Sequence, residues 1–111
     1  MAKYGNRVFE VDGVLWHSQA EFARWRELQL LEQAGQVSDL RRQVRYELVP
    51  GFRDNTGKRQ RAVTWTADFV YKEGGRTVAE DVKGVQVRDF SIRAKLFMQR
   101  YPDILLRITR A

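Results

Sequence analysis

The chain has 111 residues, of which 20 are Lys or Arg and 14 are Asp or Glu, so the formal net charge is +6. Hydrophobic residues make up 43% of the chain, which predicts a single folded domain over residues 1–111 and excludes a disordered protein. The absence of cysteine excludes disulfides, thiolate metal sites and cysteine nucleophiles, and one histidine excludes paired-histidine chemistry. Any catalysis therefore relies on carboxylates, lysine and hydroxyls.

The first predicted elements are a β-hairpin over residues 7–15 and a helix after it. Asp12-Gly13 is a dipeptide that tolerates the positive φ angles of a two-residue turn. Ser18-Gln19-Ala20-Glu21 has the spacing of a capping box, which predicts a helix that starts at Ser18 and ends near Gly35. Apolar residues at helical intervals give this helix one buried face: Phe22, Trp25, Leu28 and Leu31.

Strand-forming residues follow the helix. Residues 43–49 predict a strand that stops at Pro50-Gly51, and residues 51–60 combine turn formers with positive charge, which predicts a mobile surface loop. Residues 61–71 form the most strand-like segment. Its alternation predicts one core face, made by Val63, Trp65, Ala67, Phe69 and Tyr71.

The remaining elements complete an α/β (α+β) fold. Gly74-Gly75 predicts a two-residue turn, after which residues 77–83 return as a strand. A helix over residues 89–100 stops at Pro102, and residues 104–108 form the last strand. Because the connection through this helix is long enough for a crossover, we expect the last strand to run parallel to its predecessor. The predicted fold is a small mixed sheet with a helix on each side.

The glycine turn fixes a register that brings two acidic residues together. If Glu73 faces Arg76, Asp68 lies opposite Asp81, and Lys83 shares their face. Opposed side chains have Cβ atoms about 4.5–5.5 Å apart, and two carboxylates at that distance repel each other unless a cation lies between them. Oxygen ligands select hard ions such as Mg²⁺ or Mn²⁺. The register therefore predicts a metal site.

Two alternatives remain open for this hairpin. The acidic residues and Lys83 form a loose surface ion network worth under about 1 kcal/mol, if the hairpin face is exposed. Glu80 replaces Asp81 in the site if a one-residue bulge exchanges their faces. The spacing of Asp81-Val82-Lys83 is by itself weak evidence, because a basic chain with many acids produces it by chance.

The order of these motifs resembles the PD-(D/E)XK nuclease superfamily: a helix with a glutamate, strands that reach Ala67-Asp68, a Gly-Gly turn, then Asp81-Val82-Lys83-Gly84 and a helix and strand. More narrowly, the chain resembles, over nearly its whole length, a family of small phage-encoded proteins assigned to that superfamily. The motifs that carry this narrower resemblance are Lys3-Tyr4-Gly5-Asn6, Ser18-Gln19-Ala20-Glu21, Ala67-Asp68-Phe69, Glu80-Asp81-Val82-Lys83-Gly84 and Tyr101-Pro102.

The resemblance implies a restriction-endonuclease-like core in the order helix, three strands, helix, strand, after an N-terminal hairpin. It implies that Asp68 and Asp81 hold a divalent metal. It also implies that Lys83 positions or helps to deprotonate the attacking water and counters charge on the phosphate. Glu21 matches a helix glutamate aimed at the same metal, although a capping box explains it equally well. Ala67 stands where the motif name has proline. We assign no catalytic role to His17, and we assign to the core the three tryptophans Trp16, Trp25 and Trp65.

The predicted function is a Mg²⁺- or Mn²⁺-dependent DNA endonuclease. A short chain has no room for a base-reading domain, which favours a structure-selective enzyme, a junction resolvase or flap nuclease of phage recombination or DNA processing, acting as a homodimer. Basic residues are expected to follow the DNA backbone: Arg41, Arg42, Arg45, Lys58, Arg59 and Arg61. The alternative is a non-catalytic nucleic-acid-binding accessory protein that retains the fold, and a weaker one is a protein-binding scaffold.

No apolar run approaches the roughly 20 residues of a membrane span, and the N-terminus lacks the apolar stretch of a signal peptide. The expected location is therefore the cytoplasm, that of the host cell if the protein is phage-encoded.

Overall fold

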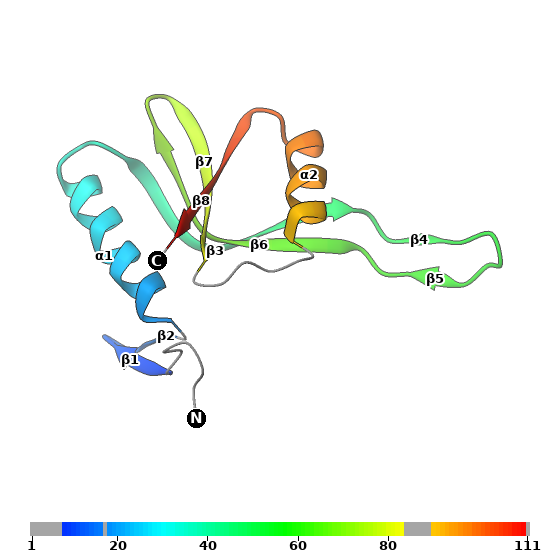
Figure 1. Ribbon diagram of the computed structural model, residues 1–111, viewed down its shortest axis with the longest axis horizontal. Helices are drawn as coiled ribbons and strands as arrows, with labels where there is room; N and C mark the ends of the chain where they lie inside the picture. The colour runs from blue at the N-terminus through cyan, green and yellow to red at the C-terminus, as the bar shows by residue number, and fades with distance from the viewer. Residues whose placement is uncertain (1–7, 17, 84–89, 111) are drawn as a thin grey trace.

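The main body of the protein is a mixed α+β arrangement around a four-stranded sheet (Figure 1). The structure is a computed structural model that describes residues 8–16, 18–83 and 90–110. The strand order in the sheet is β3-β6-β7-β8. The bounds of these strands are Ser38–Val49 for β3, Val63–Glu73 for β6, Arg76–Lys83 for β7 and Ile104–Arg110 for β8.

The last strand confirms the predicted crossover. β7 continues through helix α2 (Phe90–Arg100) into β8, and β8 pairs with β7 in parallel, whereas β3, β6 and β7 are antiparallel neighbours. Helix α1 (Gln19–Gln33) packs against one face of the sheet and α2 against the other. The predicted mixed sheet with a helix on each side is therefore confirmed.

The N-terminal hairpin and the start of α1 also follow the sequence signals. Strands β1 (Phe9–Val11) and β2 (Val14–Trp16) are joined by Asp12 and Gly13, which have φ angles of 51° and 80°. The Ser18 side chain caps α1 by accepting a hydrogen bond of 3.2 Å from the Glu21 N–H. Several sequence expectations lie outside the described residues, namely the motif at 3–6, Arg7, His17, Gly84 and Asp89.

The segment predicted as a loop is instead a second hairpin. β4 (Phe52–Arg53) pairs with β5 (Arg59–Gln60), and together they continue the ends of β3 and β6 away from the body of the protein (Figure 1). We call residues 52–60 the arm. The loop prediction was wrong because Asp54 organises the turn between the two strands: its carboxylate accepts hydrogen bonds from the backbone N–H groups of Thr56 and Lys58.

The prediction of one core face along β6 is also wrong. Trp65 and Ala67 pack in the cluster under α2 with Phe97, whereas Phe69 and Tyr71 pack in the cluster under α1. The side chains of β6 therefore change layer at Asp68. On β3, Gln43 lies opposite Asp68, between the pairs Arg42↔Phe69 and Val44↔Ala67. Its φ of 53° is left-handed and interrupts the regular alternation of side chains along β3.

The beginning of β3 differs from the prediction as well. The strand starts at Ser38, five residues before the expected start, and its early part includes a second left-handed residue, Asp39, with a φ of 54°. Polar residues and an irregular backbone hide this part of the strand from a search for alternation. Its pairing with the second half of β6 holds it in the sheet.

Candidate active site at the fork of β6 and β7

The site begins where β6 and β7 separate. Their ladder runs from Glu73↔Arg76 to Phe69↔Glu80, which confirms the register predicted from the glycine turn. One step further, the Asp68 side chain replaces a main-chain partner: its Oδ2 accepts a 2.8 Å hydrogen bond from the Val82 N–H. The predicted Asp68–Asp81 backbone pair is therefore absent from the β6–β7 ladder, which ends at Phe69↔Glu80. The Asp68 side chain, and not its main chain, bonds to β7.

The Asp68 carboxyl group lies among other acids. Burial raises its pKa to about 7, the hydrogen bond from Val82 N–H acts in the opposite direction, and the charges of Glu21 and Asp81 raise it further. A side-chain hydrogen bond between Asp68 and Asp81 adds to the rise. Asp81 is itself only 5% exposed. Two carboxylates this close repel each other when both carry charge, and a bound cation removes that repulsion.

Glu21 reaches the same site from the first turn of α1. Its backbone N–H serves the helix cap at Ser18, while its carboxylate accepts a 3.2 Å hydrogen bond from Gln43 Nε2 and lies 3.7 Å from Arg42 Nη2. Among the described residues, the capping box is represented by the bond from Glu21 N–H to the Ser18 side chain. The Glu21 carboxylate instead contacts Gln43 and Arg42, and it lines the same pocket as Asp68.

A pocket of about 410 Å³ opens beside these groups, lined by Leu15, Glu21, Arg42, Gln43 and Asp68. Arg42 is held in place by an aromatic ring, because its guanidinium carbon lies 3.8 Å from the centre of the Trp16 ring. The pocket thus combines acidic groups with one oriented cation. The sequence analysis grouped Arg42 with the residues expected to follow the DNA backbone, and it did not include Gln43. Both residues reach the pocket only through the β3–β6 register, which the sequence does not reveal.

Glu80, the rival of Asp81, is excluded from this pocket by its own contacts. It is fully buried on the opposite face of β7, where Arg24 Nε and Nη2 donate to it at 2.6 and 3.1 Å. Tyr71 and Thr109 donate hydroxyl hydrogen bonds to the same carboxylate. Burial by itself raises the pKa of Glu80, but these donors outweigh it and hold the pKa below its usual value. Glu80 is a structural ion-pair partner.

Lys83 is the last residue of β7 and pairs with Arg110 of β8. The other predicted basic residues do not form one patch. Arg41 and Arg45 are exposed on β3, Lys58 and Arg59 belong to the arm, Arg61 follows the arm, and Arg42 lies in the pocket.

Within the described residues, no three acidic or histidine side chains gather closely enough to hold a metal ion. Mg²⁺ needs fewer protein ligands, because it binds through one or two carboxylates and completes its octahedron with water and substrate phosphate. The donor set of Asp68 and Asp81 fits such an ion, since it offers only oxygen atoms and concentrates negative charge. Glu21 adds charge nearby.

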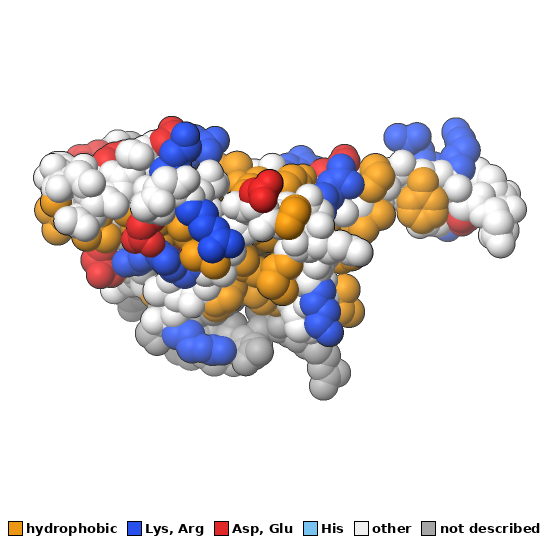
Figure 2. Space-filling view, turned by 90° about the horizontal axis from the view of Figure 1, so that it is seen from above, with side chains coloured by type: hydrophobic (Ala, Val, Ile, Leu, Met, Phe, Trp, Pro, Cys, Tyr) orange, Lys and Arg blue, Asp and Glu red, His pale blue; other side chains and the backbone are white. Residues whose placement is uncertain are grey.

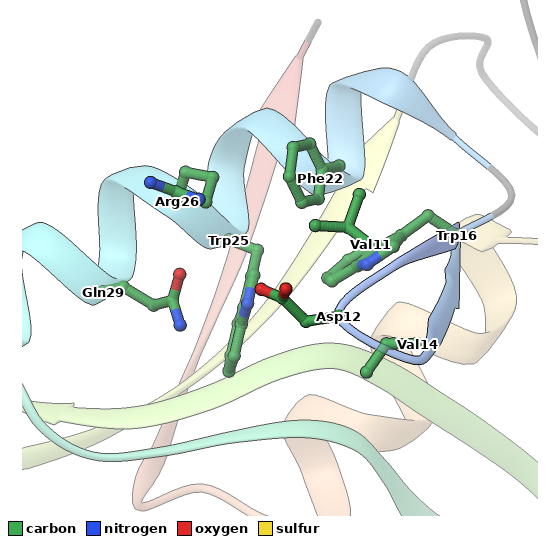
Figure 3. Close-up of a pocket in the computed structure, with 8 residues that line it drawn as sticks. All are labelled: Val11, Asp12, Val14, Trp16, Phe22, Trp25, Arg26 and Gln29. Carbon is green, nitrogen blue, oxygen red and sulfur yellow. The ribbon is translucent and has the colours of Figure 1, made fainter. Parts of the chain in front are cut away.

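A second pocket, of about 200 Å³, lies between the N-terminal hairpin and α1 (Figure 3). Figure 3 shows Phe22 and Trp25 of α1 beside Val11 and Trp16 of the hairpin, so its walls are mainly apolar. The carboxylates of the first pocket do not line it. This pocket reflects the packing of the hairpin on the helix.

The chain belongs to the DUF1064 family, described as proteins of unknown function, whose family model matches residues 1–111. Searches of curated proteins and of solved structures found no significant match. Neither helix in the described part of the chain is long and apolar enough to cross a membrane.

Proposed function

We propose that the protein is a divalent-metal-dependent DNA endonuclease with a restriction-endonuclease-like core. The observation that carries this proposal is the contact between Asp68 and Asp81 where β6 and β7 separate, with Glu21 acting on the same carboxyl. Like charges gathered in a partly buried place destabilise a fold, which favours a functional reason for them. The proposal also draws on the resemblance of the sequence motifs to PD-(D/E)XK nucleases.

In this proposal Asp68 and Asp81 hold Mg²⁺ or Mn²⁺, and Glu21 contributes negative charge from α1. When bound, the metal lowers the pKa of its water and stabilises charge on the phosphate. Arg42 stands across the pocket, and its fixed guanidinium is placed to attract a phosphate oxygen. Lys83 keeps the role that the resemblance gives it, orientation of the attacking water.

The substrate follows from charge. A net charge of +6 favours a polyanion, and phosphate contacts from basic residues do not depend on base sequence. We therefore propose branched or double-stranded DNA as substrate, in phage recombination or DNA processing. A homodimer places two such sites on opposite strands.

Cleavage assays test the proposal. Supercoiled, single-stranded and four-way-junction DNA are incubated with the protein and Mg²⁺ or Mn²⁺, and the variants Asp68→Asn and Asp81→Asn are compared with wild type. We expect each variant to cut at least about 100-fold more slowly, because it weakens the metal site. Glu73→Gln serves as a control, since it removes a carboxylate from the far end of the same hairpin. Equal cutting by wild type and Asp68→Asn contradicts the proposal.

A second candidate is a DNA-binding protein that does not cut. The observation in its favour is the net charge of +6, which attracts DNA whether or not the site cuts it. This candidate predicts salt-dependent DNA binding by the wild-type protein and no cleavage of any of the three substrates with either metal.

A further inference from the structure

The arm is a projection that contributes little to the core. β4 and β5 make their main contacts with each other, and Figure 1 shows them extending from the ends of β3 and β6, away from both helices. A two-stranded hairpin without a hydrophobic face is marginally stable in water. The arm therefore needs another source of order.

Asp54 supplies that order at the tip. Its Oδ1 accepts hydrogen bonds from Thr56 Oγ1, Thr56 N–H and Lys58 N–H at 2.6, 2.9 and 3.0 Å, and its Oδ2 accepts one of 2.9 Å from Gln60 Nε2. The hydrogen bond from the Thr56 hydroxyl and the others hold the pKa of Asp54 at about 2. One carboxylate thus ties the turn to β5, and its oxygens are engaged within the arm.

The charges of the arm are arranged in a way that disfavours the isolated hairpin. Arg53 lies directly opposite Arg59, and both are exposed. Like charges directly opposite each other destabilise a strand pair, and Lys58 adds a third positive charge. Figure 2 shows basic side chains projecting from one edge of the arm, just before its tip. An anion that lies across the arginine pair removes the repulsion.

We propose that the arm binds the sugar-phosphate backbone of duplex DNA, about one helical turn from the site of cleavage. Arg59 precedes Asp68 by nine residues in a nearly continuous extended segment, which corresponds to at most about 30 Å, against about 34 Å for one turn of B-DNA. A two-stranded ribbon also has a width that the major groove admits. The cleavage position rests on the proposed function, whereas the binding role of the arm is tested independently of it.

Duplex DNA suits the arm better than a protein partner. Arg53, Lys58 and Arg59 concentrate positive charge on one short hairpin, and such a cluster gains affinity for a polyanion by releasing its condensed counterions. Phe52, which is 52% exposed, lies on the opposite face of the ribbon from the pair, opposite Gln60. A protein contact through the arginine face of the arm predicts a change in oligomeric state in the variants described next.

The first test measures binding without cleavage. All proteins carry Asp68→Asn, and affinity for a 30-base-pair DNA duplex is followed by fluorescence anisotropy in chelator at several salt concentrations. We expect Arg53→Gln combined with Arg59→Gln to weaken binding roughly tenfold and to lower the salt-dependence slope by about 1 for each residue. The control pair Lys72→Gln with Arg76→Gln removes the same charge beside the turn between β6 and β7, far from the arm.

Equal losses in the arm variant and the control pair overturn the inference, because they show general electrostatics only. A change of oligomeric state on sedimentation, with DNA affinity unchanged, also overturns it. If the arm variant binds weakly while the wild-type protein cuts no substrate, the arm assignment stands and the nuclease proposal fails. If the wild type cuts DNA and the arm variant binds normally, the nuclease proposal stands and the arm assignment fails.

The second test uses the sign of a charge change. Asp54→Ala raises the net charge by one, so general attraction to DNA predicts tighter binding. The ordered arm predicts weaker binding, roughly threefold or more, because the variant loses the hydrogen bonds that shape the tip. Circular dichroism confirms that the core remains folded. Tighter binding by Asp54→Ala overturns the proposal that the shape of the arm matters.

Discussion

Glu80 and Asp68 are carboxyl groups of neighbouring strands in the same sheet, and they have opposite surroundings. On the α1 side, Glu80 is fully buried but surrounded by donors from Arg24, Tyr71 and Thr109, so its pKa is lowered. At the fork, Asp68 is less buried yet lies beside two further acids, so its pKa is raised. Burial acts in the same direction on both groups. Their partners decide the difference.

This difference separates a structural role from a functional one. The surroundings of Glu80 stabilise its charge, and its removal should damage the fold. The surroundings of Asp68 oppose its charge, which is an arrangement that evolution keeps where the group has another task. Asp81 belongs with Asp68 in the candidate site, so the adjacent residues Glu80 and Asp81 of β7 have different roles, the first structural and the second functional.

The largest expected effect on stability is that of Glu80→Gln. The substitution leaves Arg24, whose side chain is 17% exposed, with only the exposed Glu27 as a charged partner, at 3.8 Å. Breaking a buried pair costs about 3–5 kcal/mol. Denaturant unfolding measures the change. The matched control Glu73→Gln breaks the more exposed ion pair with Arg107 and should cost less than about 1 kcal/mol. Similar losses in the two variants contradict the structural assignment of Glu80.

A smaller effect of opposite sign is expected for Asp68→Asn in chelator. The raised pKa of Asp68 favours its protonated form in the folded state, so this stabilisation is complete below about pH 4 and lost as the pH rises to about 7. At pH 8 the variant should be more stable than wild type, by about 1–2 kcal/mol or roughly 5 °C in melting temperature. At pH 4 the difference should vanish or reverse.

Mg²⁺ or Mn²⁺ provides the control for this second prediction. Because the metal binds the folded wild-type site, it should raise the wild-type melting temperature at pH 8 and have a much smaller effect on Asp68→Asn. If Asp68→Asn is less stable than wild type at pH 8 without metal, the Asp68 carboxylate stabilises the fold. Asp68 and Glu80 would then both have structural roles.

The sequence was sufficient for the features set by local chemistry. Gly74-Gly75 determined the β6–β7 register as far as Phe69↔Glu80, since a two-residue glycine turn leaves one natural pairing. Ser18 determined the start of α1 through its side-chain cap. These signals depend on neighbours in sequence, and they were enough to bring Asp68 close to Asp81.

Features that depend on neighbours in space were missed. The change of layer at Asp68 is linked to the left-handed backbone of Gln43 on another strand, where glutamine gives no warning of a positive φ. The position of Arg42 over the Trp16 ring requires the hairpin, α1 and β3 to be assembled. The arm was taken for a loop because its order comes from side-chain hydrogen bonds of Asp54 and not from hydrophobic alternation.

The most direct test of the central claim is anomalous diffraction from crystals soaked with Mn²⁺. The account predicts a manganese peak between the carboxylates of Asp68 and Asp81, and no such peak in the Asp68→Asn variant. A manganese peak beside Glu80 would contradict the account. So would the lack of a peak between Asp68 and Asp81 at a Mn²⁺ concentration that supports DNA cleavage.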